Sequence, residues 1–133
     1  GLLQLKYIDQ SIEQRKRLCN LYKSKLSEVE GITLLDQVKS TEGNGSYFPI
    51  LVTKKFKANR DQLYAELKKN NIYARPYFSP LITRTEMYKA MPSSSKKNLP
   101  VANMVSDQVL CLPLSSDLDE NSINRITKVI KSF

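Results

Sequence analysis

The sequence predicts an α/β (α+β) fold with two layers, in which a small sheet packs under helices. Two observations favour this class. Apolar residues recur at helical spacing near both ends of the chain, and short apolar runs bounded by turn residues lie between them. A length of 133 residues is typical of one domain with a real core. We therefore expect residues 1–133 to form a single domain.

Residues 1–30 are predicted to form a helix, since their apolar residues recur at steps of three, four and seven, and Gly31 is placed to cap its C-terminus. No capping residue precedes the first apolar residues, and Gly1 is not an initiator methionine. We expect a helix cut in mid-course and hence a fragment of a longer protein; a tag remnant before a complete short protein is the alternative. Three leucines off the main apolar stripe are expected to pack on the missing part: Leu2, Leu3 and Leu18.

Two strand signals follow the helix. The run "GITLLDQ" (31–37) reads as a short strand, "STEGNG" (40–45) as a polar turn, and "SYFPILVT" (46–53) as an alternating strand. Because a proline cannot donate to a strand ladder, Pro49 places this strand at an edge or has its nitrogen turned outward. The face expected to be buried consists of Phe48, Ile50 and Val52.

A second helix is predicted to start after Asn59, with Gln62 completing a capping box. Asn70 or Asn71 is expected to end it in the left-handed conformation. Its buried stripe is predicted to contain Leu63, Tyr64 and Leu67.

The run "IYARPYF" (72–78) reads as a strand whose two faces differ in chemistry. Successive side chains of a strand point to opposite faces. One face would carry Tyr73, Arg75 and Tyr77, which is either solvated or built to contact a ligand, and the core face would carry Ile72, Ala74 and Phe78.

The last third of the chain begins with an irregular segment at 79–98, rich in turn residues. A proline is well placed to start a short helix at 100–105. The continuous apolar run "VLCLPL" (109–114) predicts a buried strand, and Asp119 is placed to cap a final helix that ends at Lys131.

Composition excludes several classes of function. The chain contains no histidine, which excludes a Ser-His-Asp triad and any His-ligated metal. Cys19 and Cys111 lack metal or redox spacing, so buried free thiols are favoured over a disulfide. No apolar run approaches the roughly 18 residues that span a bilayer, and no signal-peptide pattern opens the chain. We expect a cytoplasmic protein without membrane contact.

The formal net charge of +8 suggests an anionic partner. The lysines are scattered over different predicted elements and form no single basic block, so specific nucleic-acid binding is not expected. The residues alone support only a small basic α/β domain that binds a ligand or a partner. A non-enzymatic basic module that binds nucleic acid or another acidic partner therefore remains one alternative.

Three segments resemble the C-terminal small domain of DegT/StrS-type sugar-nucleotide aminotransferases. They are "GLLQLKYID", similar to the interdomain helix; "YFPILV" followed by "RDQLYAELKKNNIYARPYFSPL", similar to the strands and helix that lead to an H-Y-x-P corner; and "LPVANMVSDQVLCLPLSSDLDENSINRITKVIKSF", similar to the C-terminal signature. The resemblance implies a mainly antiparallel sheet, as in fold-type I pyridoxal-phosphate enzymes, with residues 1–30 as a truncated interdomain helix and 31–133 as the small domain.

The resemblance also implies a function. Such enzymes transfer an amino group from an amino acid, here expected to be glutamate, to a keto-sugar nucleotide during amino-deoxysugar biosynthesis, and they form homodimers. Their Schiff-base lysine and the other groups that bind pyridoxal phosphate belong to a preceding domain. The present chain would therefore lack catalytic and cofactor-binding residues, bind no cofactor itself and be inactive alone.

Site residues follow from matching positions. Tyr77 stands where many members have a histidine that faces the sugar nucleotide, and Ile82 stands where some have a second one. The run "YARPYFSPL" is nearest to "ARRYFYPL" of members that make amino-dideoxyhexoses on dTDP, with Pro76 and Ser79 in place of an arginine and a tyrosine. The predicted substrate-binding residues are Tyr73, Arg75, Tyr77, Ser79 and Tyr88.

Overall fold

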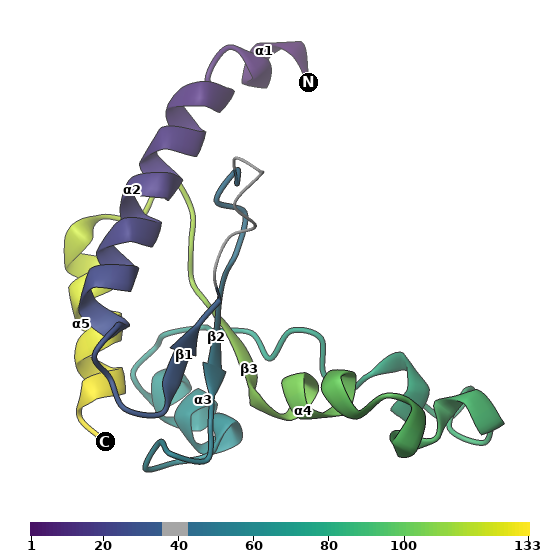
Figure 1. Cartoon of the computed structure of the whole chain (residues 1–133). Coiled ribbons are helices and arrows are strands. Elements are labelled where there is room, and N and C mark those ends of the chain that lie inside the picture. Colours follow the sequence, from purple (N-terminus) through teal and green to yellow (C-terminus); the bar gives the residue numbers. More distant parts are fainter. Residues whose placement is uncertain (36–42) are drawn as a thin grey trace.

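The computed structural model describes residues 1–35 and 43–133, and it confirms the two-layer α/β class (Figure 1). Three short 3₁₀ turns lie in the stretch 82–98: η1 (Ile82–Arg84), η2 (Pro92–Ser94) and η3 (Lys96–Asn98). The helices and strands are, in chain order, α1 (Leu2–Leu5), α2 (Ile8–Leu26), β1 (Ile32–Leu34), β2 (Phe48–Val52), α3 (Arg60–Lys69), α4 (Pro100–Gln108), β3 (Val109–Leu112) and α5 (Glu120–Lys131).

The sheet has three antiparallel strands in the order β1-β2-β3, so β2 is central. Ile50 lies opposite Leu34 on one side and Leu110 on the other. Because side chains alternate along a strand, one face of β2 is buried throughout. The helices α2, α3 and α5 cover this face, and α2 lies beside α5 (Figure 1). The predicted core residues Phe48, Ile50 and Val52 are all buried, as expected.

The central position of β2 decides between the two alternatives for Pro49. This residue pairs with Cys111 of β3, so the edge-strand alternative is wrong. The amide and carbonyl of Cys111 both bond to Arg75, and therefore point away from β2. Pro49 and Cys111 therefore form a non-hydrogen-bonded pair, in which the Pro49 nitrogen faces the side of β2 where β1 lies. The last residue pair between β1 and β2 is Leu34 with Ile50, so β1 ends before it reaches Pro49. No ladder bond is lost there.

The N-terminal helix differs from the prediction at both ends. The helix breaks between Leu5 and Ile8 and ends at Leu26, five residues before Gly31. Gly31 has φ +81° and follows a turn; a Cβ atom there would lie 2.0 Å from the amide nitrogen of Phe56. Its role is therefore close backbone approach in the left-handed region rather than helix capping. The predicted turn at 40–45 falls in part outside the described residues.

Two of the three leucines predicted to lack a partner within this chain are exposed. Leu2 is 84% and Leu3 67% exposed, as expected. Leu18 is fully buried, so that prediction is wrong. The reason is helical spacing, because Leu18 precedes Tyr22 and Leu26 at steps of four and shares their face.

The second predicted helix, α3, has the predicted caps. The side chain of Asn59 accepts the Gln62 amide at 2.9 Å, and the Gln62 side chain accepts the Asn59 amide at 2.8 Å. Leu63 and Leu67 are buried, and Tyr64 is half-buried. Asn71, with φ +56°, supplies the left-handed residue after the helix.

Residues 72–78 do not form the predicted strand. They form one isolated bridge, in which Arg75 and Cys111 exchange backbone hydrogen bonds of 2.9 and 2.8 Å. The predicted alternation holds up to this bridge, since Ile72 and Ala74 are buried. It fails afterwards, because Pro76 has no amide hydrogen and its carbonyl accepts the Ser79 amide in a turn. Phe78 is 73% exposed, so its assignment to the core is wrong.

The C-terminal elements match the prediction closely. The helix α4 begins at Pro100 but continues to Gln108, beyond the predicted end, and β3 follows with every residue buried. The buried guanidinium of Arg60 donates to the carbonyls of Ser106 and Val109, at 3.3 and 3.2 Å, and so satisfies the end of α4. Asp119 caps α5 by accepting the amide of Ser122 at 2.8 Å.

The segment at 79–98 is irregular, as predicted, and runs with α4 away from the paired helices α2 and α5 (Figure 1). Arg84 fastens it to α4 through hydrogen bonds to Asn103 and an ion pair of 2.6 Å with Asp107. Large apolar side chains on this part of the chain are exposed, among them Met87 and Met91. Within the described residues, no helix is long and apolar enough to cross a membrane.

Candidate functional site

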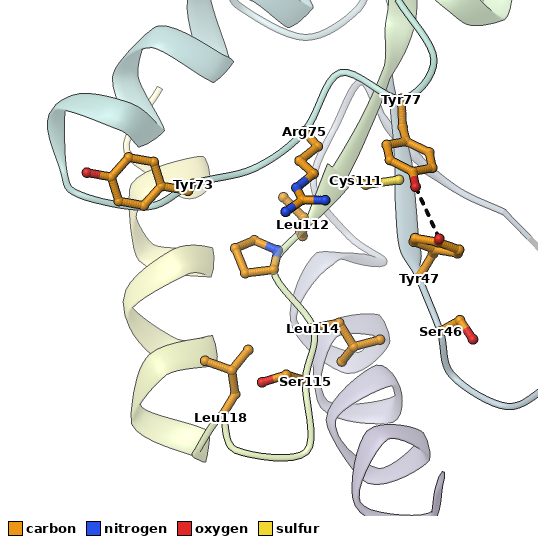
Figure 2. Close-up of a pocket in the computed structure, with 11 residues that line it drawn as sticks. Ser46, Tyr47, Tyr73, Arg75, Tyr77, Cys111, Leu112, Leu114, Ser115 and Leu118 are labelled. Carbon is orange, nitrogen blue, oxygen red and sulfur yellow. Dashed lines mark hydrogen bonds between the residues drawn. The ribbon is translucent and has the colours of Figure 1, made fainter. Parts of the chain in front are cut away.

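A pocket of about 360 Å³ opens beside the ends of β2 and β3 (Figure 2). Three stretches of the chain meet there: the residues before β2, the segment after α3, and the residues that follow β3. The pocket is lined by Ser46, Tyr47, Tyr73, Arg75, Tyr77, Cys111, Leu112, Pro113, Leu114, Ser115 and Leu118.

The bridge to β3 fixes the position of Arg75. Both backbone groups of Arg75 bond to Cys111, and Ala74 before it is buried, so the Arg75 side chain is directed outward into the pocket. Tyr77 follows two residues later and is half-buried. The guanidinium of Arg75 and the phenol of Tyr77 therefore line the same cavity (Figure 2).

Tyr47 and Tyr77 form a pair at one end of the pocket. The Tyr77 hydroxyl donates to the Tyr47 hydroxyl at 3.1 Å, and their ring centroids lie 5.1 Å apart (Figure 2). Phe78 extends the aromatic group, with its ring centroid 4.2 Å from that of Tyr77. The hydrogen bond to Tyr47 is the main cause that raises the pKa of Tyr77 above its ordinary value, so this phenol remains protonated at neutral pH.

Arg75 is the cation of the pocket. None of the described lining residues is acidic, and burial raises the pKa of the Cys111 thiol, so the thiol is neutral. The Arg75 guanidinium forms no hydrogen bond or ion pair with residues 1–35 or 43–133. Every other described arginine has a partner: Arg15 and Arg125 bond to backbone carbonyls, Arg17 to Glu120, Arg60 to Asp61 and two carbonyls, and Arg84 to Asn103 and Asp107.

The wall after β3 is held from inside the core. Tyr22 of α2 is fully buried, stacks on Phe48 with ring centroids 4.7 Å apart, and donates its hydroxyl to the carbonyl of Pro113 at 2.9 Å. This bond connects the pocket wall at 113–115 to the core helix. An exposed cation beside neutral hydroxyls and aromatic rings is suited to an anionic ligand that also carries a sugar or a base.

The predicted site residues divide into two groups. Arg75 and Tyr77 line the pocket together, and Tyr73 also lines it but has its hydroxyl directed away from Arg75 (Figure 2). Ser79 and Tyr88 lie outside the lining, on the irregular segment, where Ser79 is exposed and Tyr88 is 39% exposed.

The sequence prediction missed Ser46 and Tyr47, which come before β2, and Ser115, which follows β3 (Figure 2). A local signal was present for Tyr47, which lies within the alternating run 46–53 and directly precedes Phe48, a residue of the face expected to be buried. Its distance from Tyr77 depends on strand pairing, which the sequence alone does not give.

The lining does not fit pyridoxal phosphate as a resident cofactor, because its described residues include neither a lysine nor a carboxylate. Cys19 and Cys111 are buried free thiols, as predicted. Among residues 1–35 and 43–133, no group of three or more Cys, Asp or Glu residues could hold a metal ion.

Comparison with known proteins gives close relatives over the whole chain. The chain is 48% identical over 130 residues to a dTDP-4-amino-4,6-dideoxy-D-glucose transaminase of Escherichia coli, a match that covers 98% of this chain and 35% of the relative. It is 34% identical to a transaminase of the same name from Shigella dysenteriae, over 100% of this chain and 36% of the relative. The chain thus spans about a third of the length of these curated relatives.

Solved structures and a family model agree with these matches. The crystal structure of DesI with its TDP-sugar product has a TM-score of 0.90 at 23% identity, over 99% of this chain and 33% of that one, which shows the shared fold. The model of the DegT/DnrJ/EryC1/StrS aminotransferase family matches residues 1–131. The chain therefore belongs to the DegT/DnrJ/EryC1/StrS aminotransferase family, whose members depend on pyridoxal phosphate.

Proposed function

We propose that this chain is the C-terminal domain of a pyridoxal-phosphate-dependent aminotransferase that transfers an amino group from glutamate to a keto-sugar nucleotide in amino-deoxysugar biosynthesis. Family membership and the names of the relatives in Escherichia coli and Shigella dysenteriae support this reading. A dTDP-linked 4-keto-6-deoxyhexose is the substrate class that these names suggest. The basic nucleic-acid module is not favoured, because an aminotransferase family model covers nearly the whole chain.

The proposal assigns the cofactor to a preceding domain. Pyridoxal phosphate, when bound there, would supply the electron-withdrawing ring on which amino groups are exchanged. The present chain would contribute substrate contacts and be inactive alone, with no cofactor of its own. The proposal extends to a cytoplasmic homodimer in which each subunit contains both domains.

One observation carries the assignment of the site: within residues 1–35 and 43–133 the Arg75 guanidinium has no hydrogen-bond or ion-pair partner, and none of the described lining residues of its pocket is acidic. A guanidinium binds phosphate oxygens in a bidentate manner, which suits the diphosphate of a sugar nucleotide. Tyr77 offers a ring and a hydroxyl beside it, and Tyr73 lies at the far side. Ser79 and Tyr88, on the next segment, remain predicted contacts for parts of the substrate that extend beyond the pocket.

The test uses the full-length protein encoded by the gene that contains this chain, loaded with pyridoxal phosphate. Arg75→Ala should lower kcat/KM for the keto-sugar nucleotide by about 1 to 3 kcal/mol, or roughly 5- to 150-fold, because a charged hydrogen bond is lost. The half-reaction with glutamate should be nearly unchanged, because that donor carries no diphosphate. The control is Arg17→Ala, which removes an exposed arginine outside the pocket and should leave both half-reactions intact.

Two results would count against the proposal in different ways. If wild-type protein transfers no amino group to any keto-sugar nucleotide, the proposed function is wrong. If the wild type is active and Arg75→Ala matches it with the sugar nucleotide, the function stands but this pocket is not the diphosphate site.

A further inference from the structure

Tyr47 is held in place on both sides. The Ser46 amide before it donates to the Asn44 side chain at 3.1 Å, and Arg15 of α2 donates to the Asn44 carbonyl at 3.1 Å. Phe48 after it begins β2 and stacks on the buried Tyr22. Tyr47 itself is 58% exposed at the pocket. Its ring is therefore an exposed group on a fixed stretch of backbone.

The hydrogen bond between the two tyrosines leaves one donor unused. A phenol has one proton to donate and can also accept. Tyr77 donates its proton to Tyr47, so the proton of the Tyr47 hydroxyl is still available. Within residues 1–35 and 43–133, Tyr47 donates to no other group. The Tyr47 hydroxyl is a donor whose oxygen is positioned by Tyr77.

Arg75 and the tyrosine pair contribute to different parts of the pocket. Figure 2 shows Arg75 on one side, near Leu112, and the tyrosine pair together with Ser46 on the other. The negative charge of a diphosphate would be bound by the Arg75 guanidinium. A hexose presents C–H groups that pack on aromatic rings and oxygens that accept hydrogen bonds, which the tyrosine pair can satisfy.

We propose that Tyr47 is a specificity-determining residue that donates a hydrogen bond to an oxygen of the hexose, with Tyr77 as the residue that positions its hydroxyl. This inference rests on the proposed function, and it divides the substrate between two parts of the pocket. Arg75 binds the diphosphate that every nucleotide of this class has. Tyr47 distinguishes a nucleotide that carries a sugar from one that does not.

The test measures equilibrium binding of two probes, dTDP and dTDP-glucose, to the full-length protein by titration calorimetry. Tyr47→Phe should weaken dTDP-glucose about 3- to 10-fold, the loss of one neutral hydrogen bond, and leave dTDP unchanged. Tyr77→Phe should weaken dTDP-glucose less, about 2- to 3-fold, because the Tyr47 donor remains but is less well oriented. Arg75→Ala should weaken both probes. Tyr64→Phe removes a phenol hydroxyl outside the pocket and should change neither.

Unchanged dTDP affinity in Tyr47→Phe also shows that the pocket is intact, so loss of folding cannot imitate the expected result. Equal affinity of wild type and Tyr47→Phe for dTDP-glucose would overturn the inference, and so would an equal loss for both probes. Failure of the wild type to bind either probe would instead overturn the proposed function, and the two failures are thus distinguishable.

Discussion

The hydroxyl of Tyr22 is expected to stabilise both the core and the wall of the pocket. Its ring is fully buried on Phe48, and its hydroxyl donates to the Pro113 carbonyl at 2.9 Å. Tyr22→Phe keeps the ring and the stacking but leaves that carbonyl without its partner. Because this hydrogen bond is part-buried and Pro113 is half-buried at the pocket, the free energy of unfolding should fall by about 0.5 to 1.5 kcal/mol at pH 7, the net contribution of one hydrogen bond.

Urea denaturation followed by circular dichroism measures this loss. With a slope of about 2 kcal/mol per molar urea, the midpoint of Tyr22→Phe should lie about 0.25 to 0.75 M below that of the wild type. Tyr7→Phe is the control, because Tyr7 is 59% exposed and its hydroxyl should contribute less than about 0.5 kcal/mol. Equal midpoints for wild type and Tyr22→Phe would refute the reasoning.

The same variant has a pH signature. Burial is the main cause that raises the pKa of Tyr22 above its ordinary value of 10.0. A group whose pKa is higher in the folded state than in the unfolded state stabilises the fold below the unfolded pKa, and this contribution is lost as the pH rises. The wild type should therefore lose stability above about pH 10 more steeply than Tyr22→Phe. Parallel alkaline profiles of the two proteins would contradict the assignment to Tyr22.

Two further predictions concern Phe78 and the irregular segment that follows it. Phe78→Ala should change the free energy of unfolding by less than about 0.5 kcal/mol, since Phe78 is 73% exposed. Ile50 is fully buried, so Ile50→Ala should lower that free energy by about 2 to 5 kcal/mol in the same urea assay. Similar losses for the two variants would mean that Phe78 is packed. Arg84→Ala should accelerate amide hydrogen exchange across 82–98 and leave the sheet unchanged. The hydrogen bond from Arg84 is the main cause that lowers the pKa of Asp107 from 3.8, so the stability contributed by this pair is present above that pH and lost below it. The difference in urea midpoint between Arg84→Ala and wild type should therefore shrink on acidification. A constant difference would argue against the ion pair.

Features set by neighbouring residues could be predicted from the sequence. The capping box of Asn59 with Gln62, the cap at Asp119 and the helix start at Pro100 are all local, because each depends on groups within one turn of helix. The buried strand at 109–112 could be predicted from its continuous apolar run alone. For the same reason the fold class and the resemblance to the family were accessible without coordinates.

Predictions failed where a distant part of the chain decides the conformation. Alternation placed Phe78 in the core, but Arg75 pairs with Cys111 at one bridge only, and Pro76 cannot continue a ladder. Pro49 left two alternatives, an edge strand or a nitrogen turned away from the ladder, and only strand pairing shows that the second holds, since β2 is central and β1 ends before it reaches Pro49. Strand pairing of this kind is a long-range property that a local pattern does not encode.

The sequence by itself determined the segment that carries the site, since it singled out Tyr73, Arg75 and Tyr77 as a polar face. Only the tertiary structure decided that Tyr47, 30 residues away from Tyr77, completes the pocket. Residues 46–47 and 73–77 meet because β2 pairs with β3 along one side and Arg75 bridges to β3 on the other. A hydrogen bond between two phenols requires their oxygens to lie within about 3 Å, and that distance is set by the register of the intervening strand.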